Sequence, residues 1–426
     1  MSGGFASREE IAAHQLAKIR ELIAALIPAN LFYAKKISGI ETSLSSMEAF
    51  SRIVPFTTKQ ELVADQEKNP PYGTNLTFPL EHYTRFHQTS GTTGTPLRWL
   101  DTPDSLNWMV ESWAEIFRAC GVSHNDTIYF AFSFGPFIGF WLAFDAGQKI
   151  GALCIPGGGL GSEARLKAIL ENKTDVLCCT PTYALRLAEV AARENISLEK
   201  SCVKKIIVAG EPGGSIPATR DRLETLWPGA KVFDHHGMTE TGPVTYECPA
   251  RPGVLHILES AYFAEIVDPQ TGFAISTGEK GELILTTLGR TGSPVLRYRT
   301  GDLVQSGDGS RCVCGRFELA LHGGILGRVD DMFTVRGVNI HPSAVEDVLR
   351  RFKEITEYQA TVKVESSLAE LSLLIETNPD TDDSERLTRR IEKELQMTFN
   401  LRIPVTKVAP GTLPRFEMKA KRWIRE

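Results

Sequence analysis

The sequence predicts an α/β protein. It should have a large N-terminal domain of parallel and mixed sheets with helices, a β-rich subdomain, and a small α+β domain at the C-terminus. With 426 residues the chain is too long for one ordinary hydrophobic core, so two or three domains are expected. From residue 126, short apolar runs alternate with helical patterns, which indicates a parallel sheet covered by helices. Hairpin-like strands follow from about residue 263, and the last ~95 residues have the size of a separate unit.

Local patterns predict most elements of this fold. Residues 1–85 are expected to be helical with loops, and Ser7 with Glu10 is typical of a capping box that opens an amphipathic helix. Strands of the parallel sheet are expected at 128–134, 176–180, 205–209 and 231–233, and helices at 164–172, at 182–194 and up to 226. The later strands are expected at 262–267, 282–287 and 303–305. The C-terminal unit is expected to contain helices at 342–352 and 383–399 and strands at 358–364, 370–377 and 405–408, the last of the chain. The predicted domains are 1–328 and 329–426.

Charge and composition argue against several classes of protein. The net charge is −5 and there is no basic cluster with interleaved aromatic residues, so nucleic-acid binding is not expected. The uncharged stretch 127–144 contains Gly135, Pro136 and Gly139, which favours a buried strand, a tight turn and a helix start over a membrane span. The N-terminus does not resemble a signal peptide, and the eight cysteines are scattered. These features favour the reducing cytoplasm, free thiols and no membrane contact.

The most informative stretch is a loop at residues 88–96 that is rich in Gly, Ser and Thr. Glycine lets backbone N–H groups approach a ligand, and successive N–H groups form a concavity that binds anions. With its hydroxyl donors, the loop suits the β- and γ-phosphates of ATP. It is not a Walker A loop, because Thr95, Pro96 and Leu97 stand where that motif needs Lys-Ser/Thr. Taken alone, such a tract is more often a surface turn than a phosphate site. The candidate phosphate-binding residues are Thr89, Ser90, Gly91, Thr92, Thr93 and Gly94.

Four further motifs follow along the chain. Residues 234–240 read Asp-His-His-Gly-Met-Thr-Glu, residues 297–302 read Arg-Tyr-Arg-Thr-Gly-Asp, and residues 327–332 read Gly-Arg-Val-Asp-Asp-Met. The last motif, at 415–422, reads Arg-Phe-Glu-Met-Lys-Ala-Lys-Arg. With these motifs in this order, the chain resembles the adenylate-forming superfamily of acyl-CoA synthetases, adenylation domains and luciferases. Within that superfamily it most resembles phenylacetate-CoA ligase and related aryl-CoA ligases, over most of its length.

The resemblance implies an enzyme that activates an aromatic carboxylic acid of benzoate, aminobenzoate or phenylacetate type. The acid reacts with ATP to give acyl-AMP and pyrophosphate, and the acyl group then passes to coenzyme A with release of AMP. Between the two steps the small, mobile C-terminal domain is implied to swing about a hinge at Asp330. ATP, Mg²⁺ and coenzyme A are therefore the implied co-substrates and cofactor.

The same resemblance implies roles for individual residues. Lys419 matches the mobile catalytic lysine that stabilises charge growing at the α-phosphate, with Lys421 as its competitor. Glu240 matches the carboxylate that holds Mg²⁺, and Arg328 is implied to lie near the α-phosphate. Asp302 matches the residue that accepts hydrogen bonds from both ribose hydroxyls.

The remaining nucleotide contacts also come from the resemblance. Residues 210–212 resemble the loop that packs along adenine, and His236 replaces a common Tyr and is implied to stack on that ring. The phosphate loop of the superfamily usually has a lysine where this chain has Leu97, and Arg98 is a candidate for the missing charge. Beyond the phosphate loop, the residues implied to bind nucleotide are Gly210, Glu211, Pro212, Asp234, His236, Thr239 and Asp302.

An aromatic segment is implied to line the acid pocket. Seven Phe and Trp side chains crowd residues 130–144, and most of them are expected in the core. The turn 134–137 occupies the place where aryl-CoA ligases line their substrate pocket, and a flat aromatic acid would fit between such side chains. The predicted pocket residues are Phe134, Gly135, Pro136 and Phe137.

A second metal site is predicted from cysteine and histidine. Some relatives carry a similar set that holds structural zinc, and three thiolates with one imidazole make a sound tetrahedral set for Zn²⁺. The alternative is free buried thiols, which are common. Adjacent His235 and His236 are not expected to share a metal, because neighbouring side chains on a strand point in opposite directions. The predicted zinc ligands are Cys248, His256, Cys312 and Cys314.

Three alternatives remain open at this stage, of which a purely structural module is the least expected, because the charged and glycine positions of the motifs do nothing for a core. The acyl acceptor is either coenzyme A or the phosphopantetheine arm of a carrier protein, which would make the chain a stand-alone loading ligase. From another class, the chain is a catalytically dead nucleotide-binding regulator, although Glu240, Asp302 and Lys419 together argue against that. The sequence does not identify the acid, and a small aliphatic acid stays open beside the three aromatic types. It also leaves the oligomeric state open, with a homodimer among the options.

Overall fold

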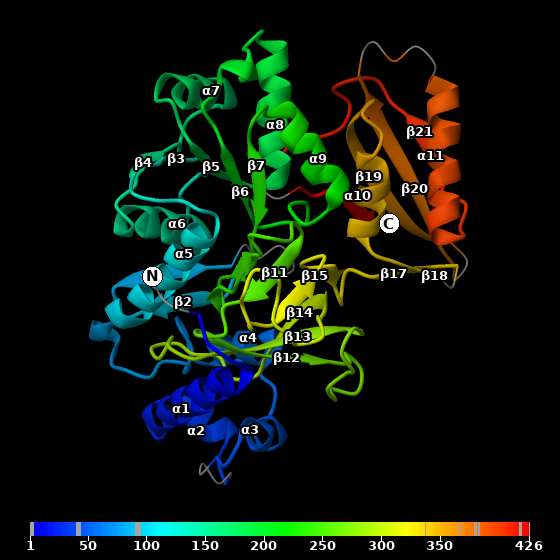
Figure 1. The fold of residues 1–426 in the computed structure, drawn as a ribbon. Helices are drawn as coiled ribbons and strands as arrows, with labels where there is room; N and C mark the ends of the chain where they lie inside the picture. Colours follow the sequence, from blue (N-terminus) through cyan, green and yellow to red (C-terminus); the bar gives the residue numbers. More distant parts are fainter. Residues whose placement is uncertain are drawn as a thin grey trace.

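The computed structural model of the chain describes residues 4–39, 44–89, 95–336, 338–365, 368–378, 381, 384–416 and 420–425. The fold is α/β, as predicted, with a C-terminal α+β unit beside a larger N-terminal part (Figure 1). Among the helices in these ranges, none is both long and apolar enough to cross a bilayer.

A five-stranded parallel sheet forms the centre of the N-terminal part. In spatial order its strands are β4 (Leu153–Pro156), β3 (Thr127–Phe130), β5 (Val176–Cys179), β6 (Lys205–Val208) and β7 (Lys231–Asp234). Side chains alternate between its faces: Ile128 and Phe130 belong to one core cluster and Tyr129 to the other. One face is covered by α5 (Pro103–Ala119) and α6 (Ile138–Lys149), and the other by α7 (Ser162–Glu171), α8 (Pro181–Arg193) and α9 (Pro217–Leu226).

The structure corrects one expectation for this sheet and adds one strand to it. Strand β3 ends at Phe130 instead of residue 134, because the chain turns where Phe134 adopts a positive φ of 48° ahead of Gly135 and Pro136. Strand β4 was not predicted. It is a four-residue strand at the edge of the sheet, with Leu153 63% exposed.

The other sheets of the N-terminal part are antiparallel. The largest consists of β12 (Tyr262–Val267), β13 (Lys280–Thr287), β14 (Tyr298–Gln305) and β16 (Gly327–Arg328). Smaller ones are formed by β10 (Thr245–Glu247), β11 (Val254–Ile257) and β15 (Ala320–His322), by β1 (Arg85–Gln88) and β2 (Arg98–Asp101), and by β8 (Gly237–Met238) and β9 (Gly242–Pro243). The strand expected at 303–305 begins earlier, at Tyr298, because its ladder with β13 continues past Gly301.

The N-terminal segment is helical, as expected. Its elements are α1 (Arg8–Leu26), α2 (Leu31–Lys36), α3 (Met47–Ile53), α4 (Lys59–Lys68) and the 3₁₀ turn η1 (Leu80–His82); a second 3₁₀ turn, η2 (Leu198–Lys200), follows α8. The capping box of α1 is only half formed. The Ser7 hydroxyl accepts the N–H of Glu10, but the Glu10 carboxylate takes the N–H of Ala6 rather than that of Ser7.

The C-terminal unit has its own hydrophobic core, whose buried members run from Phe333 to Val405. Its elements are β17 (Phe333–Val335), β18 (Val338–Ile340), α10 (Pro342–Arg350), β19 (Ile355–Glu365), β20 (Leu368–Thr377), α11 (Ser384–Phe399), β21 (Val405–Lys407) and β22 (Trp423–Arg425). The strand near residue 405 is not the last one, because β22 pairs in parallel with β19 at the sheet edge. The domain boundary after residue 328 stays a prediction.

Candidate active site

The predicted site residues come from loops at the carboxyl ends of β6 and β7, from β14 and β16, and from the C-terminal segment. Ligands of parallel sheets bind at this end of the strands. Arg328 is paired with Asp302 in the ladder between β16 and β14. The backbone N–H of Ala420 reaches the loop after β6. The fold therefore brings five separate parts of the chain together.

Asp302 lies at the centre of one group of predicted residues. It is 3% exposed, because alternate residues of β14 face inward. Its Oδ1 accepts Nη1 of Arg328 at 3.2 Å, and its Oδ2 lies 3.1 Å from Nε2 of His236. Burial opposes the charge on Arg328, but Asp302 and then Asp330 raise the pKa of that guanidinium. Asp330 accepts Nε of Arg328 at 2.9 Å, so the predicted hinge residue is bonded to this group.

Glu240, the predicted Mg²⁺ ligand, lies in a second group. It is 6% exposed and accepts the Tyr298 hydroxyl at 3.3 Å. Nζ of Lys59 lies 3.7 Å from Oε1 of Glu240. A β-bridge between Thr57 and Tyr298 brings the start of α4 to this place. Neither Lys59 nor Tyr298 was given a role from the sequence.

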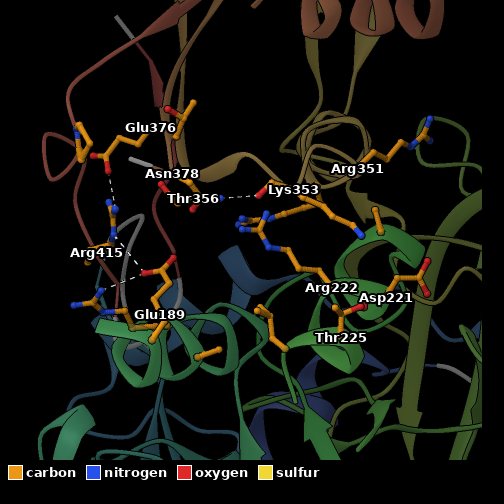
Figure 2. A pocket seen from close by; sticks show the side chains of 18 of the residues that line it. Glu189, Asp221, Arg222, Thr225, Arg351, Lys353, Thr356, Glu376, Asn378 and Arg415 are labelled. Atoms are coloured by element: carbon orange, nitrogen blue, oxygen red, sulfur yellow. Dashed lines mark hydrogen bonds and ion pairs between the residues drawn. The ribbon is translucent and has the colours of Figure 1, made fainter. Parts of the chain in front are cut away.

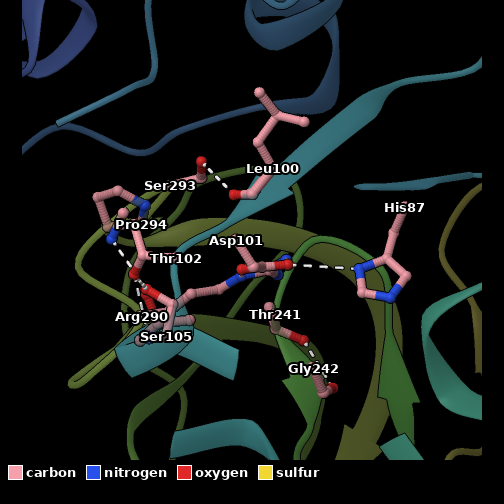
Figure 3. Close-up of polar contacts among 12 residues, drawn as sticks. His87, Leu100, Asp101, Thr102, Ser105, Thr241, Gly242, Arg290, Ser293 and Pro294 are labelled. Carbon is pink, nitrogen blue, oxygen red and sulfur yellow. Dashed lines mark hydrogen bonds and ion pairs between the residues drawn. The ribbon is translucent and has the colours of Figure 1, made fainter. Parts of the chain in front are cut away.

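A buried ion pair supports the loop that carries Glu240 (Figure 3). Arg290 and Asp101 are both 0% exposed, and the guanidinium binds both carboxylate oxygens at 2.7 Å. The third nitrogen of Arg290 donates to the carbonyl oxygen of Thr239 at 2.7 Å. Burial alone would raise the pKa of Asp101, but the charge of Arg290 and the His87 imidazole hold it below its usual value. Sequence reasoning missed this pair, because the two residues carry no motif.

The loop after β6 touches the C-terminal segment through Glu211. Its Oε1 accepts the N–H of Thr182 at the start of α8, and its Oε2 accepts the N–H of Ala420, both at 2.8 Å. Gly210 adopts a positive φ of 94°, which favours glycine. A Cβ at Gly214 would lie 2.6 Å from Cγ of Asp234, so glycine lets this loop pack against β7. Lys419, adjacent to Ala420, lies outside the described residues.

Asp234 and His235 are held in the interior. The Ser215 hydroxyl donates to Oδ2 of Asp234 at 2.5 Å. Burial raises the pKa of Asp234 to about 7, and the nearby Glu247 charge adds to this shift. The His235 ring packs edge-on against Trp113 with centroids 4.3 Å apart, and burial lowers the pKa of His235 to about 3. His235 is therefore a neutral core residue, whereas His236 faces Asp302.

The predicted phosphate loop joins β1 and β2. Of its six candidate phosphate-binding residues, Thr89 is described: it donates its N–H to the Leu97 carbonyl at 2.9 Å and accepts the Leu97 N–H on its hydroxyl at 3.0 Å. Ser90, Gly91, Thr92, Thr93 and Gly94 lie outside the described residues. Leu97 is 1% exposed, so the position of the family lysine is part of the core. Nη1 of Arg98 donates to the carbonyl of Pro71 at 3.0 Å.

The predicted acid pocket is a cluster of aromatic rings next to this loop. The carbonyl of Pro136 accepts the N–H of Gln88, 2.9 Å away, which ties the turn 134–137 to β1. Phe132 and Phe140 stack with centroids 3.9 Å apart. The Phe134 ring meets Trp141 edge-on at 5.1 Å. Flat surfaces therefore border the turn that the sequence assigns to the acid.

The four predicted zinc ligands are close together. One ligand atom from each of Cys248, His256, Cys312 and Cys314 lies within 4.8 Å of the others. Sγ of Cys248 is 3.6 Å from Sγ of Cys312, and Sγ of Cys314 is 3.5 Å from Nε2 of His256. Nδ1 of His256 lies 3.0 Å from the carbonyl oxygen of Glu318. A hydrogen bond there leaves Nε2 free to act as a ligand, as at many metal-binding histidines.

Comparison with known proteins identifies the family. The model of the AMP-binding enzyme family matches residues 51–289, and that of the AMP-binding enzyme C-terminal domain matches residues 337–426. Phenylacetate-coenzyme A ligase of Thermus thermophilus is 30% identical over 96% of this chain and 95% of its own. The ligase of the same name from Escherichia coli is 33% identical over 87% of this chain and 84% of its own.

Two solved structures of 2-hydroxyisobutyryl-CoA ligase differ in their similarity to this chain. The structure in the postadenylation state, with R3-HIB-AMP, is 27% identical, covers 99% of this chain and 91% of its own, and superposes with a TM-score of 0.94. The structure in the thioesterification state, with 2-HIB-AMP and CoA, is 28% identical with the same coverage, but its TM-score is 0.74. The arrangement described here is therefore closer to the postadenylation state of that relative.

Proposed function

This chain belongs to the AMP-binding enzyme family, and we propose that it is an AMP-forming acid–CoA ligase for an aromatic carboxylic acid. The acid is of phenylacetate, benzoate or aminobenzoate type. The observation that carries the proposal is the hydrogen bond from Ala420 to Glu211, because it brings the segment beside Lys419 to the loop assigned to adenine. The names of the relatives in Thermus and Escherichia support phenylacetate-like acids and CoA.

In the first half-reaction, the acid carboxylate attacks the α-phosphate of ATP and pyrophosphate leaves. Asp302 accepts the ribose hydroxyls, and Arg328, already bonded to it, offers a guanidinium fork to the α-phosphate. Lys419 neutralises the charge that grows on the phosphate in the transition state. Leu97 stands where the superfamily usually has a lysine, so the phosphate loop lacks that charge. Lys59, whose ammonium lies close to Glu240, adds positive charge to the site.

Glu240 fits a magnesium ion, because it is a buried carboxylate in the turn between β8 and β9. Magnesium takes one or two carboxylates and completes its octahedron with water and phosphate oxygens, so it would neutralise phosphate charge there. Tyr298 and the Arg290–Thr239 hydrogen bond keep Glu240 in place.

In the second half-reaction, the CoA thiol attacks the acyl carbon and AMP leaves. Lys419 and its segment must withdraw first, since the thiol needs the same space. We assign this movement to rotation of the C-terminal domain about Asp330. The two states of 2-hydroxyisobutyryl-CoA ligase, which match this chain to different degrees, support such a movement.

The zinc prediction stays part of the proposal as a structural site. Three thiols and an imidazole within 4.8 Å of one another suit tetrahedral Zn²⁺. Such an ion would tie β10 and β11 to the loop 312–314. It would not touch the reacting atoms.

One pair of rate measurements tests the proposal. A panel of aromatic acids is assayed for AMP formation with and without CoA, and Lys419→Ala is compared with the unaltered protein. Lys419→Ala should abolish ATP–pyrophosphate exchange but spare thioester formation from supplied acyl-AMP. Equal loss of both half-reactions would refute the role of Lys419. Absence of any adenylate would favour a regulatory nucleotide-binding protein, and a preference for holo-carrier proteins over CoA would favour a loading ligase.

A further inference from the structure

A cavity of about 910 Å³ lies between the two parts of the chain, bordered by α8 and α9 on one side and by α10 and β20 on the other (Figure 2). Among the residues that line it, none belongs to the proposed active site. Figure 2 shows Arg222 extending from α9 toward the segment that carries Lys353 and Thr356. Arg415 closes one edge, since it binds Glu376 at 2.6 Å and lies 3.7 Å from Glu189 of α8.

The lining of this cavity is positively charged. Seven basic side chains and four acidic ones border it. Three of the acids already form ion pairs with basic residues of the same cavity, namely Glu376 with Arg415, Asp347 with Arg351, and Glu189 with Arg186. Arg350 and Arg193 also pair with Glu346 and Glu194, which lie just outside the lining. Arg222 and Lys353 then stand against Asp221, so the cavity keeps a small excess of positive charge for a ligand.

Three buried polar groups of the lining have no hydrogen-bond partner among the described residues. They are Nη1 of Arg222, Nη2 of Arg350 and Oγ1 of Thr377. Arg350 is 3% exposed and Thr377 is 1% exposed, so bulk water reaches neither freely. Guanidinium nitrogens only donate, so a ligand that satisfies them must be an acceptor. Buried donors of this kind are rarely left unpaired in native proteins.

Two of these groups also repel each other across the domain interface. Arg222 belongs to α9 and Arg350 to α10, which lie side by side (Figure 1). Burial, followed by the positive charge of Arg350, lowers the pKa of Arg222 to about 10. An anion between the two guanidinium groups would replace this repulsion by two attractions.

We propose that this cavity binds a small anion with at least two phosphate charges, which bridges Arg222 and Arg350 and holds the two domains in the arrangement described here. Guanidinium forks and a threonine hydroxyl suit phosphate oxygens. The volume is large enough for a phosphate ester of nucleotide size. The site itself does not depend on the ligase assignment. Its kinetic consequence does, because an anion that holds the domains together slows thioester formation only if they must separate for that step.

Calorimetric titration of the full-length protein tests the site. Inorganic pyrophosphate and adenosine 3′,5′-bisphosphate are the two probes, and they distinguish a bare phosphate ligand from a nucleotide one. Arg222→Gln and Thr377→Val should each weaken binding, by about tenfold or more for the arginine, because a charged hydrogen bond is lost. The matched control, Arg118→Gln, removes one exposed guanidinium from α5 and should change affinity less than about twofold.

Hydrogen exchange supplies a second readout that does not depend on activity. The anion should slow exchange in residues 217–226 and 342–350 of the unaltered protein, but not of Arg222→Gln. The proposal fails if neither anion binds, or if Arg222→Gln and Thr377→Val bind as tightly as the unaltered protein. Thioester formation from supplied acyl-AMP is then compared with and without the anion. If binding is shown but the rate is unchanged in both proteins, the domain rotation is refuted and the site is retained.

Discussion

Glu211 accepts a 2.8 Å hydrogen bond from the backbone nitrogen of Ala420, 209 positions further along the chain. The same carboxylate accepts the N–H of Thr182, so one side chain joins the start of α8 to the C-terminal segment. Ala420 follows Lys419 in the sequence, so we expect this contact to matter for the role proposed for that lysine.

Replacing Glu211 should therefore separate the two half-reactions. Glu211→Ala removes a charged acceptor from Ala420, so ATP–pyrophosphate exchange should fall by about tenfold or more. Thioester formation from supplied acyl-AMP should stay within about threefold. Glu194→Ala removes a surface carboxylate beyond the end of α8 and serves as the control. A similar fall in both half-reactions would contradict this reasoning.

Lys59 provides a second kinetic prediction. Its ammonium lies 3.7 Å from Glu240, where the phosphates and Mg²⁺ are proposed to bind. Lys59→Ala should raise the KM for Mg-ATP several-fold, and more strongly at low salt, because the lost charge is partly exposed. Lys68→Ala, at the other end of α4, should leave KM unchanged. An unaltered KM in Lys59→Ala would remove this lysine from the nucleotide site.

The Arg290–Asp101 pair predicts a large effect on stability. Both side chains are fully buried, so truncating one leaves an uncompensated charge. Arg290→Leu should lower the free energy of unfolding by about 3–5 kcal/mol. Because the double variant Arg290→Leu/Asp101→Leu removes both charges, it should recover part of that loss. Urea unfolding of the two single variants and the double variant measures the coupling. Additive losses would show that the pair is not coupled.

Asp234 predicts a dependence of stability on pH. Its folded pKa of about 7 lies above the unfolded value of about 3.9. Between these values the folded protein holds a proton that the unfolded chain has lost, so the contribution of Asp234 to stability falls as pH rises from 4 to 7. Asparagine does not titrate, so Asp234→Asn removes this loss of stability with rising pH. Its urea midpoint should rise relative to that of the unaltered protein between pH 5 and pH 8. A difference that is constant with pH would contradict the raised pKa, and Asp221→Asn is the control.

The cysteine cluster predicts bound metal. Elemental analysis of the purified protein should find about one zinc per chain. Cys312→Ser should lose the zinc and unfold at lower temperature, because metal binding by three thiolates and an imidazole contributes to folding. Cys202→Ser, at an exposed cysteine, should keep it. A stable preparation without metal would contradict this prediction.

The sequence predicts the parallel sheet well, because buried strands such as β5 are continuous apolar runs between helical patterns. It also points to Asp302, His236 and Arg328, whose side chains meet in the structure. It does not predict Lys59 or Arg290. Their positions depend on the bridge between Thr57 and Tyr298 and on a buried pair, and long-range pairing leaves no local pattern. The edge strands β4 and β22 were missed for the same reason.

The short strand β22 has a consequence for how Lys419 moves. Residues 423–425 are hydrogen-bonded into the sheet of the C-terminal domain, where they pair in parallel with β19. If the C-terminal domain rotates as proposed, β22 turns with its sheet. We expect the same rotation to set the arrival and departure of Lys419. Substitutions at Asp330 should accordingly alter both half-reactions at once, even though they lie outside the chemistry.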